Sequence, residues 1–165
     1  MNIQAMNDRQ YGLLFGVCRS IRYHDRRRAF FERLHQITSG LTVLLAGSVL
    51  FELAVIAALL SAWDIVVGYS VKASLHRDLK QRFGALEIAI LLGLDDDSTW
   101  QHHEAERLRI EQDEPPIFRA LDMLCHNELL TADGLKRGNG ANFATLNAWQ
   151  RTTRHFFHWA DSNPV

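Results

Sequence analysis

LHQITSGLTVLLAGSVLFELAVIAALLSAWDIVVGYSV occupies residues Leu34–Val71 and forms an apolar block near the middle of the chain. The block contains no Lys or Arg, and its only formal charges are Glu52 and Asp64. Cations are concentrated on both sides of it: Arg19, Arg22, Arg26, Arg27, Arg28 and Arg33 precede it, and Lys72, Arg77, Lys80 and Arg82 follow it. An apolar block with cations at both ends is typical of a membrane-embedded segment.

The length of this block favours two membrane crossings over one. A single helix over the whole block would be about 55 Å long at the usual helical rise, whereas the hydrocarbon core of a bilayer is roughly 30 Å thick. A shorter single span over Leu41–Ala62 fits by length, but it leaves one basic cluster on each side of the membrane, which the positive-inside rule disfavours. A soluble oligomer that buries a long hairpin between its subunits is a further alternative.

A helical hairpin avoids these difficulties, because it returns both basic clusters to the cytoplasmic side. We expect its arms at about residues 37–50 and 53–70, with the connection at Phe51-Glu52. Each arm reaches only about 21–26 Å at helical rise, so local thinning of the bilayer or snorkelling of flanking side chains has to cover the remainder. We therefore predict an integral protein of the bacterial inner membrane with both termini in the cytoplasm.

Asp64 is the candidate polar site inside the membrane. If the chain turns at residues 51 and 52, Asp64 lies level with three hydroxyl side chains of the first arm, Thr38, Ser39 and Thr42. An Asp at membrane depth costs about 2.5–3.5 kcal/mol on insertion scales. Two interpretations remain open: an Asp whose hydrogen bonds fix the helix register, or a polar residue along an ion or proton path.

A second group of residues has the composition of a membrane interface. Cations and aromatic residues are enriched where membrane helices meet the headgroups. The candidates before the block are Arg26, Arg27 and Arg28, and those at the end of the second arm are Trp63, Tyr69 and Lys72.

Helical spacing extends beyond the apolar block, so the predicted fold class is all-α. Apolar residues repeat at helical intervals over residues 8–33 and again at Leu75, Leu79, Phe83, Leu86 and Ile90, which predicts that the hairpin continues into the cytoplasm. Further helices are expected over residues 99–111, 116–131 and 143–160. We divide the chain into the hairpin, residues 1–94, and a cytoplasmic helical region, residues 95–165, which is a candidate site for a protein partner.

Composition excludes several classes of function. The net charge of −1 over 165 residues leaves no overall nucleic-acid footprint. The two cysteines, Cys18 and Cys125, are far apart and predict neither a disulfide framework nor a cysteine zinc site. The eight histidines do not match a zinc-protease spacing, and no nucleophile elbow or phosphate-binding glycine loop occurs. We expect no enzyme activity, no cofactor and no metal.

The basic-aromatic entry from Arg26 to Phe31, the two closely spaced apolar arms and the continuing helix resemble the SLATT proteins, small bacterial two-transmembrane proteins. The resemblance covers roughly residues 10–92. It implies a membrane effector that oligomerises and permeabilises the bilayer in phage–host or mobile-element conflict. In that case the small and hydroxylated faces form the contact between copies, and Asp64 lies nearest a lumen. The later run from Arg107 to Glu128 is similar to uncharacterised prophage-associated membrane proteins. A non-permeabilising adaptor or superinfection-exclusion protein is the alternative.

Overall fold

The protein is described by a computed structural model for residues 8–47, 51–93, 99–135 and 142–159. Every regular element in these residues is a helix, which confirms the all-α prediction. The helices are α1 (Asp8–Ala46), α2 (Phe51–Val67), α3 (Tyr69–Leu92), α4 (Trp100–Gln112), α5 (Arg119–Ala132) and α6 (Ala148–Thr153).

The chain forms two compact units. One unit, here called the tail unit, comprises Met1–His24 and Leu79–Val165, and the other, the hairpin unit, comprises Asp25–Asp78. Helices α1 and α3 each contribute to both units. The boundary predicted between residues 94 and 95 lies outside the described residues, and the two units do not follow it.

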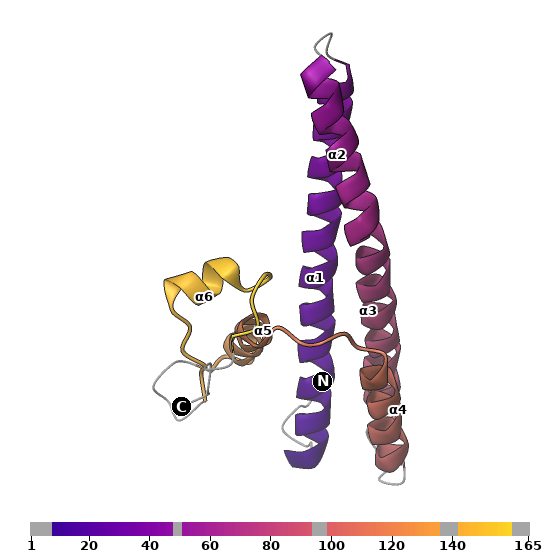
Figure 1. Ribbon diagram of the computed structural model, residues 1–165. Helices are drawn as coiled ribbons and strands as arrows, with labels where there is room; N and C mark the ends of the chain where they lie inside the picture. Colours follow the sequence, from indigo (N-terminus) through magenta and orange to yellow (C-terminus); the bar gives the residue numbers. More distant parts are fainter. Residues whose placement is uncertain (1–7, 48–50, 94–98, 136–141, 160–165) are drawn as a thin grey trace. The chain divides into compact units, whose positions relative to one another are not determined.

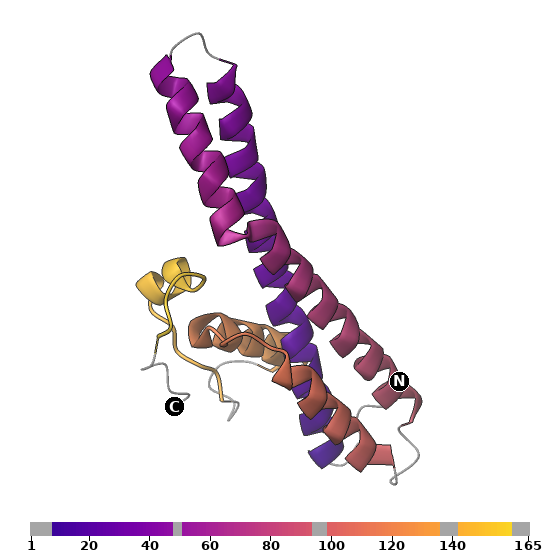
Figure 2. The same ribbon diagram turned by 45° about the vertical axis from the view of Figure 1, so that its right-hand side comes forward.

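In the hairpin unit, the second half of α1 runs antiparallel to α2 (Figures 1 and 2). The connection lies earlier than predicted, because Phe51 and Glu52 already belong to the first turn of α2. A carboxylate in this position is stabilised by the positive end of the helix dipole, which favours a helix beginning at Phe51. Helix α1 ends at Ala46. The last part of the predicted first arm, residues 48–50, lies outside the described residues.

Gly68 separates α2 from α3. Its φ is +64°, a left-handed conformation that glycine adopts without the steric cost that a Cβ brings. The helical course resumes at once, since the Lys72 backbone N–H donates to the Gly68 carbonyl. The predicted continuation of the helix after Tyr69 is therefore correct, but Gly68 breaks the helix just before it.

The tail unit has an apolar core where the first part of α1 meets the last part of α3. Four of the five α3 residues predicted from helical spacing belong to this core: Leu79, Phe83, Leu86 and Ile90. The fifth, Leu75, is 39% exposed. Leu13 and Val17 of α1 and Trp100 and Ile110 of α4 complete this core. The four α3 side chains are nearly inaccessible to solvent, so their burial supplies much of the hydrophobic stabilisation of the unit.

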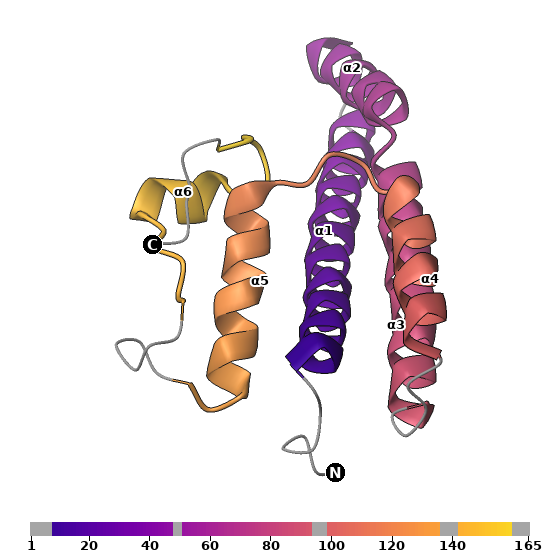
Figure 3. The ribbon, with the colours of Figure 1, turned by 90° about the horizontal axis from the view of Figure 1, so that it is seen from below.

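Within the tail unit, α4 lies alongside α3, and α5 lies on the other side of α1 (Figure 3). The predicted helix over residues 99–111 agrees with α4 to within one residue. Helix α5 begins three residues later than predicted, since Phe118 is extended after Pro115 and Pro116. It ends with a hydrogen bond from the Leu135 N–H to the Leu130 carbonyl around Gly134, whose φ is +79°.

The prediction of a helix over residues 143–160 was wrong. Among the described residues 143–159, only Ala148–Thr153 is α-helical, as α6. The backbone before it is held by Asn127, whose side chain bonds both the N–H and the carbonyl of Ala144 at 2.8 Å. Asn147 then caps α6 through a reciprocal pair of bonds with Gln150. These side-chain bonds hold the backbone before α6 in an extended conformation, so the helix begins only at Ala148.

Candidate functional site

The hairpin unit presents an apolar surface to its surroundings. Among the described residues between 37 and 71, twelve large apolar side chains are more than 40% exposed: Ile37, Leu41, Val43, Leu44, Phe51, Val55, Ile56, Leu59, Trp63, Ile65, Val66 and Val71. Ala57 is the buried residue of α2. Monomeric soluble proteins rarely expose a contiguous apolar patch of this kind.

One helical run in the described part of the chain, Phe51–Leu92, is long and apolar enough to cross a membrane. Gly68 divides this run into α2 and α3. Only 6% of its most apolar window is buried, whereas the core helix of a soluble protein would be mostly buried. The exposure of this helix therefore distinguishes it from an ordinary core helix.

Asp64 of α2 is paired with His35 of α1. The Asp64 Oδ2 lies 2.8 Å from the His35 Nδ1, and the Asp64 side chain is 17% exposed. The second carboxylate oxygen, Oδ1, is buried without a hydrogen-bond partner. The pair joins the two helices of the hairpin unit by one strong contact and leaves one acceptor unsatisfied.

The three predicted hydroxyl partners of Asp64 are placed differently. The Thr38 hydroxyl donates to the backbone carbonyls of Leu34 and His35 on its own helix. Ser39 is exposed and Thr42 is half-buried. The reason is the position of the connection: because α2 begins at Phe51, Asp64 meets α1 one helical turn earlier, at His35 instead of Ser39.

Two of the predicted interface residues, Arg27 and Lys72, lie near the aromatic ring of Phe31. The Arg27 guanidinium lies 4.5 Å from the centre of this ring, and the Lys72 Nζ lies 5.8 Å from it. The His76 ring stacks on it at 5.7 Å between centroids. Arg27 is almost fully buried, so its charge is held against the π faces of the ring and not in open solvent.

The remaining interface candidates take part in local contacts. The Trp63 Nε1 donates to the Tyr69 hydroxyl at 3.1 Å, and Tyr69 lies 6.4 Å from Phe31 by ring centroids. Arg28 pairs with Asp25 and with Glu32 on α1. Arg26 is half-buried. Arg27, Lys72 and Tyr69 thus lie near Phe31 in the hairpin unit, and their position at a headgroup region stays a prediction.

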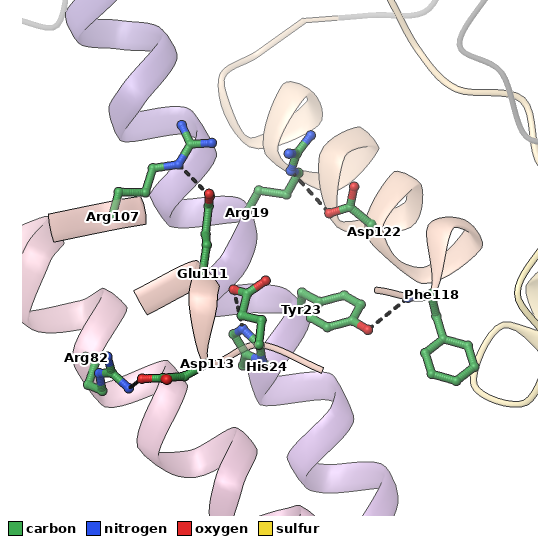
Figure 4. A network of polar contacts seen from close by, with 10 residues as sticks. Arg19, Tyr23, His24, Arg82, Arg107, Glu111, Asp113, Phe118 and Asp122 are labelled. Carbon is green, nitrogen blue, oxygen red and sulfur yellow. Dashed lines mark hydrogen bonds and ion pairs between the residues drawn. The ribbon is translucent and has the colours of Figure 1, made fainter. Parts of the chain in front are cut away.

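The tail unit contains a polar network centred on the segment between α4 and α5 (Figure 4). His24 is fully buried, and its Nε2 lies 2.9 Å from the Glu114 Oε1. The Asp113 Oδ2 accepts a hydrogen bond from Arg82 at 2.6 Å. The Phe118 N–H donates to the Tyr23 hydroxyl at 3.0 Å. Three residues of this short segment are therefore tied to α1 and α3.

Cys18 and His103 are among the ionisable groups of the tail unit whose pKa is shifted by burial. Burial, together with the neighbouring Glu87 carboxylate, raises the pKa of the Cys18 thiol to about 12. Burial, followed by the charge of His102, lowers the pKa of His103. Neither nitrogen of the His103 ring has a hydrogen-bond partner. The thiol is therefore protonated and unreactive at neutral pH, and the imidazole is neutral.

His35, His24 and His76 are the important side chains that the sequence reasoning did not identify. Each is one member of a contact whose other member is distant in the chain, at Asp64, Glu114 or Phe31. A signal was present for His35, because it is the ionisable residue closest to the start of the apolar block. No comparable pattern marks His24 or His76.

In the described ranges, no group of three or more His, Cys, Asp or Glu side chains is placed to hold a metal ion. No protein-family model, curated protein or solved structure matches the chain. The functional interpretation therefore depends on the physical features of the two units.

Proposed function

We propose that the protein is an integral membrane protein whose hairpin unit inserts into the bacterial inner membrane as two spans. The observation that supports this is the exposure of large apolar side chains on both arms, such as Val43 and Leu44 on α1 and Ile65 and Val66 on α2, each more than 70% exposed. In water this surface would carry a penalty of about 25 cal/mol per Å² of apolar area. Lipid removes the penalty without requiring another protein.

The distribution of charge supports a hairpin with both termini in the cytoplasm. Arg26, Arg27 and Arg28 lie at the start of the first arm, and Lys72 and Arg77 follow the second. A hairpin keeps both groups on the side that the positive-inside rule favours. Helix α2 has 17 residues, which corresponds to about 26 Å at helical rise. The first residues of α3 or a thinner bilayer supply the remaining length.

We further propose that copies of the chain associate in the membrane and act as an effector in phage–host or mobile-element conflict. His35 and Asp64 are polar groups within the proposed membrane segment, and Asp64 Oδ1 has no partner. Polar groups at this depth normally face another helix or a water-filled lumen. The exposed Ser39 lies one turn from His35 on α1 and extends the same polar face. The SLATT-like arrangement of the sequence supports the assignment to an effector.

Membrane potential in expressing cells tests the effector function. The wild-type chain should depolarise cells that carry a potential-sensitive dye, and Asp64→Leu should reduce the effect by at least tenfold at equal membrane abundance. Glu52→Gln is the matched control, because Glu52 is an exposed acid of the same helix, and it should behave like wild type. An unchanged potential at high expression and during phage infection would contradict an effector that permeabilises the membrane.

A second candidate function is a non-permeabilising adaptor, such as a superinfection-exclusion protein. The feature that favours it is the tail unit, in which α4 exposes Leu108 on a densely charged helix. An adaptor predicts that Leu108→Glu abolishes the protective phenotype while membrane insertion and potential stay unchanged. An effector without a tail partner predicts that this variant behaves like wild type.

A further inference from the structure

The end of the tail unit carries a cluster of exposed aromatic side chains. Trp149 is 64% exposed, Phe156 is 60% exposed and Phe157 is 54% exposed. Trp149 and Phe156 are seven residues apart, a spacing that returns two side chains to the same side of a helical course. The turn continues past α6, since the Phe156 and Phe157 N–H groups both donate to the Thr153 carbonyl. We call Trp149, Phe156 and Phe157 the aromatic surface.

This surface is presented by an anchored segment. The backbone of Ala144 is bound twice by Asn127 of α5, and the His158 ring stacks on Phe118 at 4.0 Å between centroids. Ala144 and Thr153 are buried. The segment is therefore fixed to the tail unit on both sides of α6 while Trp149, Phe156 and Phe157 remain exposed.

The segment that carries the aromatic surface has formal charges of one sign. No Asp or Glu occurs between Asp133 and Asp161, whereas Arg151 and Arg154 lie within this interval. Arg151 is an exposed residue of α6. Aromatic rings combined with cations and no acids are complementary to a negatively charged phospholipid surface, where rings insert at headgroup level and cations attract anionic lipids.

We infer that the aromatic surface is a second membrane contact, which docks the tail unit on anionic phospholipid headgroups. This inference rests on the proposed insertion of the hairpin unit, since that insertion brings the tail unit to a bilayer. Trp149, Phe156 and Phe157 enter the interface, and Arg151 pairs with lipid phosphate. A protein partner would fit the aromatic rings alone, whereas the absence of acids over the whole segment favours lipid.

Spin-label accessibility in the full-length protein tests the inference. Single cysteines replace Trp149, Phe157, Thr131 and Leu59, and each variant is labelled at neutral pH and reconstituted into vesicles. The native thiols react little, because Cys125 is fully buried and the pKa of Cys18 is raised to about 12. Thr131 is an exposed residue of α5 and serves as the aqueous control. Leu59 is an exposed residue of α2 and reports on insertion of the hairpin unit.

The measured quantity is the ratio of a label's collisions with oxygen to its collisions with a water-soluble nickel complex. In vesicles with equal amounts of phosphatidylglycerol and phosphatidylcholine, we expect this ratio to be at least threefold higher for labels at 149 and 157 than for the label at 131. Phosphatidylcholine alone should reduce this ratio, as should Arg151→Glu. Arg109→Glu, an equal charge change at an exposed arginine of α4, should leave it unchanged.

Three outcomes would overturn the inference. Labels at 149 and 157 that match the label at 131 in both kinds of vesicle show a surface that stays in water. Exclusion of both collision agents at these sites shows a surface covered by protein. A ratio that changes neither with Arg151→Glu nor with the lipid charge shows that anionic headgroups are not recognised. A water-exposed label at residue 59 overturns the insertion of the hairpin unit itself, so the two failures are distinguishable.

Discussion

The Nε2 of His24 lies 2.9 Å from the Oε1 of Glu114, and both side chains are almost completely removed from solvent. Phe83 stacks on the His24 ring at 5.6 Å between centroids, which closes the other face of the imidazole. The pair joins α1 to the segment between α4 and α5 within the tail unit. A buried pair of this kind is a strong constraint on packing, because the loss of either partner removes a buried hydrogen bond.

Removing one member of this pair should destabilise the tail unit. We expect Glu114→Ala and His24→Ala each to cost about 1–3 kcal/mol of unfolding free energy, since each removes a hydrogen bond between two buried side chains. Arg9→Ala is the control, because Arg9 pairs with Glu104 at an exposed site where such contacts contribute about 0–1 kcal/mol. Denaturant unfolding followed by tryptophan fluorescence measures the three values. Equal costs for Glu114→Ala and Arg9→Ala would contradict the structural role of the buried pair.

His103 should make the stability of the tail unit depend on pH. Its pKa is lowered from the ordinary value of 6.5 in the folded state, mainly by burial. Protonation therefore favours the unfolded chain, so the contribution is fully present above pH 6.5 and is lost as pH falls through the lower, folded pKa. His103→Leu should flatten this acid limb. Urea unfolding at a series of pH values, read from Trp100 beside His103, checks the prediction, and an unaltered acid limb in the variant would refute it.

Cys18 should react slowly with alkylating reagents. The thiolate is the reactive form, and the pKa of Cys18 is raised to about 12 by burial and by the hydrogen bond to Glu87. In a Cys125→Ser background, we expect iodoacetamide at pH 8 to modify Cys18 at least tenfold more slowly than an exposed cysteine at residue 131. Glu87→Gln should accelerate the reaction, because it removes a negative charge that raises the pKa. A rate equal to that at residue 131 would show that the thiol is not shielded.

Short-range patterns predicted the elements that depend on local sequence. Apolar spacing identified Leu75, Leu79, Phe83, Leu86 and Ile90 as one face, and all of these except the exposed Leu75 lie in the core. The prolines correctly separated α4 from α5. Intervals of three and four residues are sufficient for such features, because neighbouring turns of one helix determine them.

Features that depend on distant residues were predicted less well. The partner of Asp64 was missed because a connection displaced by a few residues moves the opposing helix by one turn, from Ser39 to His35. The last helix was predicted too long because Asn127, far from it in sequence, binds the backbone of Ala144. His24 and Glu114 are 90 residues apart in the sequence, so no local pattern indicates that they pair.

Membrane fractionation of the expressed full-length chain, with an alkaline carbonate wash, tests the insertion of the hairpin unit most directly. We expect the wild-type protein to remain in the washed membrane pellet and to require detergent for release. Leu59→Arg should move it to the soluble or aggregated fraction, since it places a charge on an exposed apolar site in the middle of α2 at a cost of about 2.5–3.5 kcal/mol in the bilayer. Leu108→Arg, a matched change on α4, should leave the protein in the pellet. Recovery of the wild-type chain as a monodisperse species in plain buffer, with residues 34–71 buried between subunits, would contradict the account.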